Sequence, residues 1–392
     1  MRRQMHPLEG ENIFQKIRRI CEEEKAKNRR VLNLAWGQPE GPAMLLAREK
    51  AAESVMSDDE QMHGYQNNGS PGVPDFARIF VQAHFKFTLE GDLAYLPIPG
   101  IKPMLGLVQI ACRPPGKNIK VAYMSDPGFP TPKDWGRFLG VESYDLPLHP
   151  GNKFAFKAED ILPGTNLIMG NYPHNPSGQI YTAGQWAEVI IHCIKNNVRI
   201  FNDNPYHFFA YDGLYCALAE AAKDFPELSW AEAYTASKEI GNGCGWRVGA
   251  MVGSPDFIAD IAKIKSQTDS GFAAPLATGV LCALTAGRVE IEARRDEYGR
   301  RIAKLIEILE SRGMKLVHRP EAGLFTLWHC PRLALGKEFD NADEFNMAMI
   351  LGPEIGIAGV PFGKYIRYAV TSDIIAMQQA IEEIFTAAKV SY

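Results

Sequence analysis

The chain has 392 residues and a mass of 43.5 kDa, a length that predicts two or three domains. Hydrophobic residues make up 46% of the chain and charged residues 22%, which excludes a disordered, collagenous or coiled-coil protein. The formal net charge is −4, from 42 basic and 46 acidic residues, so there is no basic excess that would favour nucleic acid as a partner.

Composition also bears on metals, compartment and membranes. The seven cysteines are widely spaced and form no C-x-x-C pair, and the nine histidines form no H-E-x-x-H motif, so no disulfide framework or metal site is indicated. Free thiols are typical of the cytoplasm, where we expect this protein. The first ten residues are basic without an apolar run behind them, unlike a secretory signal. The uncharged stretch 270–287 is rich in Ala, Gly and Thr, which predicts a buried helix and no membrane partner.

Short apolar runs alternate with amphipathic stretches along the first 288 residues. The helical pattern is expected over residues 12–29, 74–87, 101–112, 131–139 and 182–196. The strand pattern is expected over residues 31–35, 92–98, 119–124, 141–146, 165–170, 198–203, 230–235 and 246–252. Such alternation predicts an α/β domain built around a mostly parallel sheet with helices on its faces.

The pattern changes after about residue 288. A long helix is expected to reach residue 312, followed by a helix near 341–349 and by short strands near 314–318, 324–329 and 365–370. A last helix over 373–388 has Ser372 as its expected N-cap. These elements predict a second, smaller α+β domain.

Three short polar motifs follow predicted strands. Asn175 lies in an Asn-Pro-x-Gly turn, Asp203 ends the strand over 198–203, and Lys238 follows the strand over 230–235. In α/β proteins the ends of strands form the ligand-binding edge of the sheet. Each motif alone is explained as well by a plain turn, a capping aspartate or a solvated lysine.

Taken together, the motifs resemble the pyridoxal-phosphate-dependent aminotransferases of fold type I, class I/II. The resemblance covers nearly the whole chain, and the joint order and spacing of its motifs carry it. The motifs are Gly37-Gln-Pro39, Gly64-Tyr65 with Gly69, Asp126-Pro-Gly-Phe-Pro130, Asn175-Pro-Ser-Gly178, Asp203-Asn-Pro-Tyr206, Ser237-Lys238 with Arg247, and Tyr365-Ile-Arg367. It implies a large cofactor-binding domain over 49–288 and a small domain built from both chain ends, 1–48 and 289–392.

The resemblance also implies catalytic roles. Lys238 resembles the lysine that forms a Schiff base with the aldehyde of pyridoxal 5'-phosphate and then moves the Cα proton of the substrate. Asp203 resembles the aspartate that keeps the ring nitrogen protonated, which makes the ring an electron sink. Tyr206 and Asn175 resemble the hydrogen-bond donors to the ring hydroxyl oxygen.

Further positions resemble cofactor and substrate ligands. The phosphate ligands implied by the resemblance are Thr235, Arg247 and the backbone amides of Ile101 and Lys102, and Ser237 is implied as a further cofactor ligand. Phe129 resembles the aromatic side chain that stacks on the ring. Arg367 resembles the arginine that binds the α-carboxylate of the substrate, helped by Gly37 and Asn175.

The resemblance extends to the assembly and the reaction. Tyr65 resembles a tyrosine that reaches the phosphate of the neighbouring subunit, which implies a homodimer with shared active sites. The implied reaction moves an amino group from an amino acid to a 2-oxo acid, most often 2-oxoglutarate in this family. A carbon–sulfur lyase or an aminocyclopropane-carboxylate synthase of the same fold would keep every cofactor residue.

The sequence departs from the family pattern at a few positions. The interval from Lys238 to Arg247 is one residue longer than usual, which predicts a bulge within 241–245. Ile13 and Ala273 stand where LL-diaminopimelate aminotransferases have Tyr and Asn, so that activity is not assigned.

Two classes outside this fold type remain as weaker alternatives. The run Gly-Asn-Gly-Cys-Gly over 241–245 superficially suggests a nicotinamide dehydrogenase, but it is not G-x-G-x-x-G and no helix is expected after it. A cofactor-binding regulator without catalysis is the other alternative, although no basic helix-turn-helix segment is present.

Overall fold

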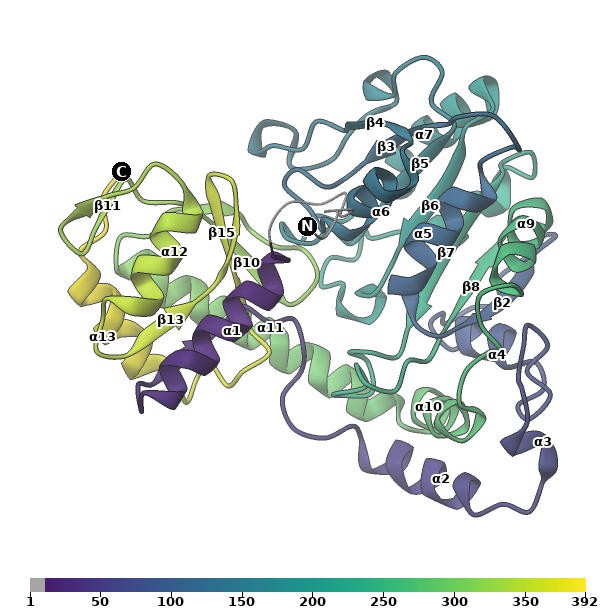
Figure 1. Ribbon diagram of the computed structural model, residues 1–392, viewed down its shortest axis with the longest axis horizontal. Helices are drawn as coiled ribbons and strands as arrows, with labels where there is room; N and C mark the ends of the chain where they lie inside the picture. The colour runs from purple at the N-terminus through teal and green to yellow at the C-terminus, as the bar shows by residue number, and fades with distance from the viewer. Residues whose placement is uncertain (1–10) are drawn as a thin grey trace, which may run out of the picture.

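The computed structural model describes residues 11–392, which fold into two bodies connected by the long helix α11 (Arg288–Ser311) (Figure 1). We call the part built around the wide sheet the large body, and the part at the left of Figure 1, around α12 and α13, the small body. The first ten residues of the expected N-terminal segment lie outside the described range.

Within residues 11–392, seven strands form the sheet of the large body in the order β2-β8-β7-β6-β5-β3-β4. The strands are β2 (Ala94–Ile98), β3 (Lys120–Tyr123), β4 (Glu142–Asp145), β5 (Leu167–Gly170), β6 (Arg199–Asp203), β7 (Trp230–Thr235) and β8 (Gly249–Gly253). The neighbours from β4 to β7 pair in parallel, whereas β8 is antiparallel to both β7 and β2. The prediction of a mostly parallel sheet is confirmed. The central strands are continuous apolar runs because both of their faces are covered.

Helices cover both faces of this sheet, as Figure 1 shows. One apolar cluster joins a face of the sheet to α5 (Ile101–Ala111), α6 (Thr131–Leu139) and α9 (Pro255–Lys265). Another cluster joins the opposite face to α4 (Phe76–Gln82), α7 (Ala183–Asn196), α8 (Leu218–Ala221) and α10 (Ala274–Ala286). Short 3₁₀ turns lie at Pro150–Asn152, Ala158–Asp160, His207–Phe209 and Ala222–Asp224.

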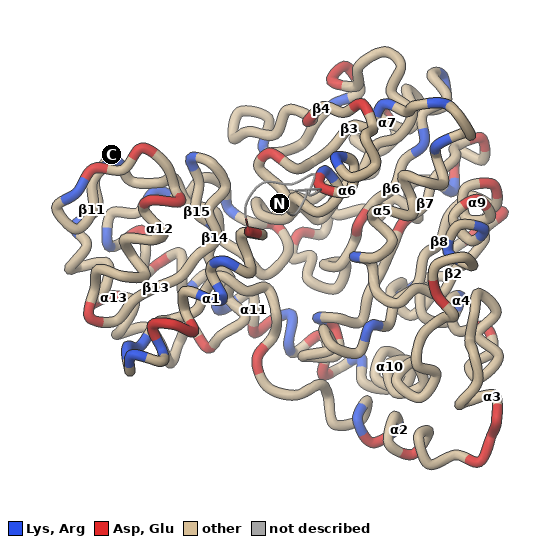
Figure 2. Tube along the Cα trace, in the orientation of Figure 1, with Lys and Arg blue, Asp and Glu red and all other residues tan. Residues whose placement is uncertain are grey.

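The uncharged stretch forms α10, a helix as predicted, which is drawn without charged residues in Figure 2. It packs along α2 (Leu45–Val55), and α3 (Glu60–His63) lies nearby. A Cβ at Gly279 would lie 2.9 Å from the Cβ of Ala51, so glycine permits this close approach. Among the described residues no single helix combines the length and apolarity needed to cross a bilayer, and only α10 and α11 together do so, across a 79° bend.

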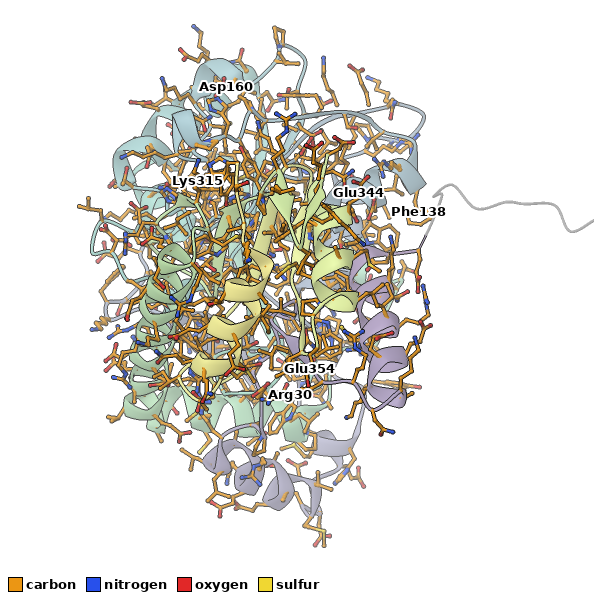
Figure 3. All side chains as sticks on the ribbon, turned by 90° about the vertical axis from the view of Figure 1, so that its left-hand side faces the viewer. Arg30, Phe138, Asp160, Lys315, Glu344 and Glu354 are labelled. Atoms are coloured by element: carbon orange, nitrogen blue, oxygen red, sulfur yellow. The ribbon has the colours of Figure 1, made fainter. Side chains whose placement is uncertain are left out.

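The small body contains a second sheet in the order β14-β15-β10-β9, with neighbouring strands antiparallel. Its strands are β9 (Leu316–His318), β10 (Phe325–His329), β14 (Val360–Phe362) and β15 (Tyr365–Ala369). The other strands are β1 (Val31–Asn33), which pairs in parallel with β13 (Gly356–Ala358), and the hairpin of β11 (Leu333–Ala334) and β12 (Lys337–Glu338). The helices beside the sheet are α1 (Ile13–Ala26), α12 (Ala342–Leu351) and α13 (Gln378–Ala388), seen from this side in Figure 3.

Both described ends of the chain pack in the small body, because α1 and β1 join apolar clusters formed by the last third of the chain. Met44 and Ala47 are already buried in the core of the large body. The first segment therefore leaves the small body before α2 begins, a few residues ahead of the limit at residue 48 that the resemblance implies.

The predicted start of the last helix is wrong. The helix begins at Gln378, and Ser372 is not its N-cap. The hydroxyl of Ser372 instead donates to a carboxylate oxygen of Glu40 at 2.5 Å, which ties this segment to the start of the chain. The residues between them form a separate turn, in which the Asp373 carboxylate accepts hydrogen bonds from the backbone amides two and three residues on.

Candidate active site

Two adjoining cavities lie where the large and small bodies meet, beyond the ends of β6 and β7. The inner cavity, of about 220 Å³, is enclosed by the large body, and the outer cavity, of about 420 Å³, also contacts α1 and the small body. Five residues line both cavities: Lys102, Phe129, Asn175, Tyr206 and Lys238. The structure thus brings together side chains that are far apart in the sequence, as expected for strand ends at one edge of a sheet.

Asp203 is the acidic group of the inner cavity. It ends β6 and is 7% exposed, and its Oδ1 atom is buried without a hydrogen-bond partner among the described residues. Burial raises the pKa of Asp203 to about 7, and the charge of Lys238 opposes this rise. Because an unpaired buried carboxylate is costly, the geometry favours a ligand that presents a protonated nitrogen to this oxygen.

Lys238 follows β7 directly and is half-buried at the boundary of the two cavities. Its Nζ atom lies 5.2 Å from the centre of the Tyr206 ring. Tyr206 is buried, and its burial raises the pKa of the phenol, while the charge of Arg367 lowers it. The lysine amine is therefore placed to serve a ligand in either cavity.

The far end of the inner cavity collects groups that bind anions. The helix α5 begins there, and its N-terminal residue Ile101 lines the cavity together with Thr235, Ser237 and Arg247. The hydroxyls of Thr235 and Ser237 lie 2.8 Å apart. Gly100 precedes the helix with a φ of 77°, and a Cβ at this position would collide with the guanidinium of Arg247. A helix N-terminus, an arginine and two hydroxyls suit a phosphate dianion.

The interval between Lys238 and Arg247 contains two hydrogen-bonded turns. The amide of Gly243 donates to the carbonyl of Gly241 at 3.0 Å, and the amide of Trp246 donates to the carbonyl of Gly243 at 3.0 Å. The guanidinium of Arg247 donates to the carbonyls of Cys244 at 3.0 Å and Pro99 at 3.2 Å. The segment leads into β8 and not into a helix, which removes the argument for a dinucleotide loop.

Arg367 is the buried cation of the outer cavity. It lies on β15, is 2% exposed, and donates to Oδ1 of Asn175 at 2.8 Å and to the carbonyl of Ala35 at 2.6 Å. Its Nε has no partner among the described residues, and burial lowers the pKa of the guanidinium to about 10. A buried cation held only by neutral oxygens favours an anionic ligand such as a carboxylate.

Neutral side chains complete the walls. Phe129 lines both cavities, and Gly37 lines the outer one, where a Cβ would lie 2.8 Å from the ring of Phe325. Phe325 and Asn171 also belong to the site, although neither was predicted as a site residue. The side chain of Asn171 donates to the backbone carbonyl of Asp203 at 2.8 Å and accepts from the amide of Asn175 at 3.0 Å.

Other lining residues were also missed. Cys244, Phe14, Gln15 and Arg18 line one cavity or the other, and nothing in their local sequence marks them, since they come from a plain helix and a turn. Tyr65, in contrast, lines neither cavity and is 78% exposed on the surface of the large body.

The inner cavity fits pyridoxal 5'-phosphate on the chemistry of its donors. It offers an amine for an aldehyde at Lys238, an unpartnered buried carboxylate for a pyridine nitrogen at Asp203, and an anion cradle at the start of α5 for a phosphate. Phe129 supplies an aromatic wall beside them.

Comparisons with known proteins agree with this chemistry. Residues 29–366 match the model of the family described as aminotransferase class I and II. An LL-diaminopimelate aminotransferase of Dehalococcoides mccartyi (strain CBDB1) is 29% identical over 369 residues, which cover 92% of each chain. An LL-diaminopimelate aminotransferase from Methanocaldococcus jannaschii is also 29% identical, over 91% of this chain and 85% of its own.

Solved structures show the same fold. A single mutant of the aspartate aminotransferase from Thermus thermophilus superposes with a TM-score of 0.83 at 20% identity, over 98% of this chain and 99% of its own. The match of the family model over most of the chain, together with this fold and a cavity that suits the cofactor, identifies the enzyme class. The chain belongs to the class I and II aminotransferases of fold type I and is a pyridoxal-phosphate-dependent aminotransferase.

Proposed function

We propose that the two cavities form one active site, in which an amino acid and a 2-oxo acid bind in turn, with glutamate and 2-oxoglutarate as one pair. Two buried atoms without a hydrogen-bond partner carry this proposal: Oδ1 of Asp203 in the inner cavity and Nε of Arg367 in the outer cavity, with Lys238 lining both cavities. One group suits a ring nitrogen and the other a substrate carboxylate, so the amine between them faces the reacting carbon.

Bound pyridoxal phosphate would supply an electrophilic aldehyde and a ring that withdraws electrons from the Cα of the substrate. Asp203 would keep a proton on the ring nitrogen, and Tyr206 and Asn175 would donate to the ring hydroxyl oxygen. Phe129 would stack on one face of the ring. The phosphate would be held by Thr235, Ser237, Arg247 and the amides of Ile101 and Lys102.

Lys238 would carry the proton of the reaction. Its Nζ would first hold the cofactor and then, once released, accept the proton from Cα and return it, so that one amine acts as base and acid. Arg367 would fix the α-carboxylate through its fork of donors, with Asn175 and Gly37 beside it. Since donor and acceptor use the same groups in turn, we expect ping-pong kinetics.

The names of the relatives support transamination over a lyase of the same fold. The relatives at 27–29% identity are named LL-diaminopimelate aminotransferases, which also supports a role in amino-acid biosynthesis. The donor itself is left open, because Ile13 packs towards the small body and Ala273 precedes α10, where we would expect the Tyr and Asn of those enzymes.

A panel of amino donors assayed against 2-oxoglutarate tests the function. We expect glutamate to form in amounts that match the donor consumed, and Lys238→Ala to abolish its formation while the fold is retained. Ammonia released from a sulfur-containing donor, without glutamate, would show a lyase instead. Pyridoxal phosphate that fails to bind the wild-type chain would contradict the proposal altogether.

We further propose a homodimer with shared sites. Apolar side chains are exposed on and after α2, where Leu45 is 56% exposed, Val55 53% and Met56 81%, and Tyr65 is exposed close by in the sequence. Such a patch supports burial against a second subunit. Tyr65 would then reach the phosphate of the partner and not that of its own chain.

Mixed dimers test this arrangement. A Tyr65→Phe chain paired with a Lys238→Ala chain would leave one intact site and one site with both defects, so we expect about half of the normal activity per dimer. An active monomer in sedimentation, or a mixed dimer with no recovered activity, would contradict the shared site.

A further inference from the structure

The outer cavity has basic side chains and no acidic ones. Among the described residues that line it, Arg18, Lys102, Lys238 and Arg367 are cationic, and none is Asp or Glu. The proposed function employs Arg367 for one carboxylate and Lys238 for the reacting atoms. The side chains of Arg18 and Lys102 are therefore the two cations of this cavity to which no anion has been assigned.

Arg18 belongs to the face of α1 that is turned to this cavity. Phe14 and Gln15, three or four positions before it, line the same cavity, whereas Ile17 and Ile20 on the other face are buried in the small body. The guanidinium of Arg18 lies 4.2 Å from the centre of the Trp36 ring. Stacking on an indole fixes the plane of the guanidinium and leaves its donor edge free for a ligand.

Arg18 has no ion pair within residues 11–392, although acidic residues are common on α1. Its neighbour Arg19 binds Glu11 at 3.1 Å and Glu23 at 2.8 Å, and it does not line the cavity. Glu22 lies one helical turn after Arg18, at the spacing that favours an ion pair, yet the Arg18 side chain lies over Trp36 instead. The two adjacent arginines thus have different environments, one neutralised and one not.

Lys102 is partly compensated. Burial raises the pKa of Asp134 on α6, and the charge of Lys102 is one of three that oppose this rise, so a carboxylate lies within the electrostatic reach of Lys102. It also lines the inner cavity, at the start of α5. Of the two cations without an assigned anion, Arg18 is the one that lines the outer cavity alone.

We infer that Arg18 binds a second carboxylate, at the far end of the substrate side chain, and that the enzyme therefore acts on dicarboxylic amino acids and 2-oxo acids. The inference rests on the proposed function, because it takes the α-carboxylate to lie on Arg367. Phe14, Phe129 and Trp36 provide apolar walls for the methylene groups between the two carboxylates. Donor and acceptor occupy the cavity in turn, so both must satisfy the same arginine.

Binding of unreactive acids to the cofactor-loaded enzyme tests the inference. Glutarate and pentanoate have the same chain length, but only glutarate has a carboxylate at each end. By calorimetry, we expect Arg18→Gln to raise the Kd of glutarate at least about tenfold, as for the loss of a charge-assisted hydrogen bond, and to leave the Kd of pentanoate unchanged. Arg19→Gln is the matched control on the same helix and should change neither constant, while Arg18→Lys should restore part of the glutarate affinity.

The possible outcomes distinguish a failure of the role of Arg18 from a failure of the proposed function. An unchanged glutarate Kd in Arg18→Gln, or an equal loss for both acids, would overturn the role of Arg18. A full loss of glutarate selectivity in Lys102→Gln with none in Arg18→Gln would overturn it as well and assign the second carboxylate to the lysine. In each case a wild-type enzyme that still forms glutamate would leave the proposed function intact, whereas a chain that binds no pyridoxal phosphate would overturn both.

Discussion

Two buried carboxylates on neighbouring strands, Asp203 on β6 and Glu232 on β7, have opposite surroundings. Glu232 is fully buried and accepts hydrogen bonds from Asn202 at 2.7 Å, Asn204 at 2.8 Å and Tyr234 at 2.6 Å, and from backbone amides at the start of α8. Asp203 is buried nearly as well, but one of its oxygens has no partner among the described residues. Burial raises the pKa of both groups, and in Glu232 the donors oppose that rise.

The contrast follows from the alternation of side chains along a strand. Asn202 pairs in register with Glu232, and Asp203 pairs with Ala233, so the saturated network and the unsatisfied oxygen lie on opposite faces of the sheet. On one face, the hydrogen bonds to Glu232 use this carboxylate to hold the surrounding segments together. A missing partner on the other face makes a carboxylate available to a ligand.

The largest effect is expected at Asp203. Replacing it with Ala should lower turnover by about a thousandfold, because the ring nitrogen loses the charge that keeps its proton. Thermal unfolding should show an intact fold, since no protein donor loses its acceptor at Oδ1. Asp203→Glu should have a milder effect, and near-normal turnover in Asp203→Ala would contradict the assignment.

Replacing Glu232 should lower the stability of the fold, because this carboxylate is part of a buried hydrogen-bond network. Glu232→Ala would leave the amides of Asn202 and Asn204 and the hydroxyl of Tyr234 without their acceptor, so we expect a loss of at least about 3 kcal/mol in the free energy of unfolding. Denaturant titration of the two alanine variants side by side measures the difference. Equal stability of Glu232→Ala and Asp203→Ala would remove the distinction between the two carboxylates.

The stability of the fold should depend on pH through the buried carboxyl group of Asp203. The pKa of Asp203 is about 7 in the folded, ligand-free chain and near 4 in an unfolded chain, so the folded state retains this proton to higher pH. Its stabilising contribution is complete below about pH 4 and is lost as the pH rises to about 7, with a slope of up to about 1.4 kcal/mol per unit. Unfolding measured from pH 4 to 8 should show this slope in the wild type but not in Asp203→Asn. Identical profiles would contradict the raised pKa.

A small effect is expected at the phosphate end. Thr235→Val removes one hydroxyl of the cradle and leaves Ser237 and Arg247, so we expect the Kd of pyridoxal phosphate to rise about tenfold or less. Equilibrium dialysis measures this Kd, and Thr268→Val, in the turn that follows α9 and outside both cavities, serves as a control. If Thr235→Val lost as much affinity for pyridoxal phosphate as Arg247→Ala, the expectation that the guanidinium contributes more than this hydroxyl to phosphate binding would be wrong.

Much of the large body could be predicted from the sequence, because parallel strands covered on both faces are continuous apolar runs that end in polar motifs. Asn175, Asp203 and Lys238 each follow such a run, and all three line the inner cavity. The sequence alone could not show that one oxygen of Asp203 lacks a partner, since this depends on the register of β6 against β7.

Elements whose packing is set by distant segments were harder to predict. The helix α2 has weak amphipathicity and packs one side against α10, about 230 residues later, so no local pattern marks it. The helix expected over 74–87 is shortened to α4, which begins after Asp75 in a left-handed conformation with a φ of 56°. Arg18 was missed for a similar reason, because only the contact with Trp36 and the cavity distinguishes it from Arg19.

We propose above that Lys238 holds the cofactor in the inner cavity. Borohydride makes a lysine–aldehyde bond permanent, so reduction of the loaded enzyme followed by peptide mapping identifies the lysine directly. We expect one labelled peptide, which contains Lys238, and no label in Lys238→Ala. A label on Lys102 or on any other lysine, or an unlabelled wild-type enzyme, would contradict it.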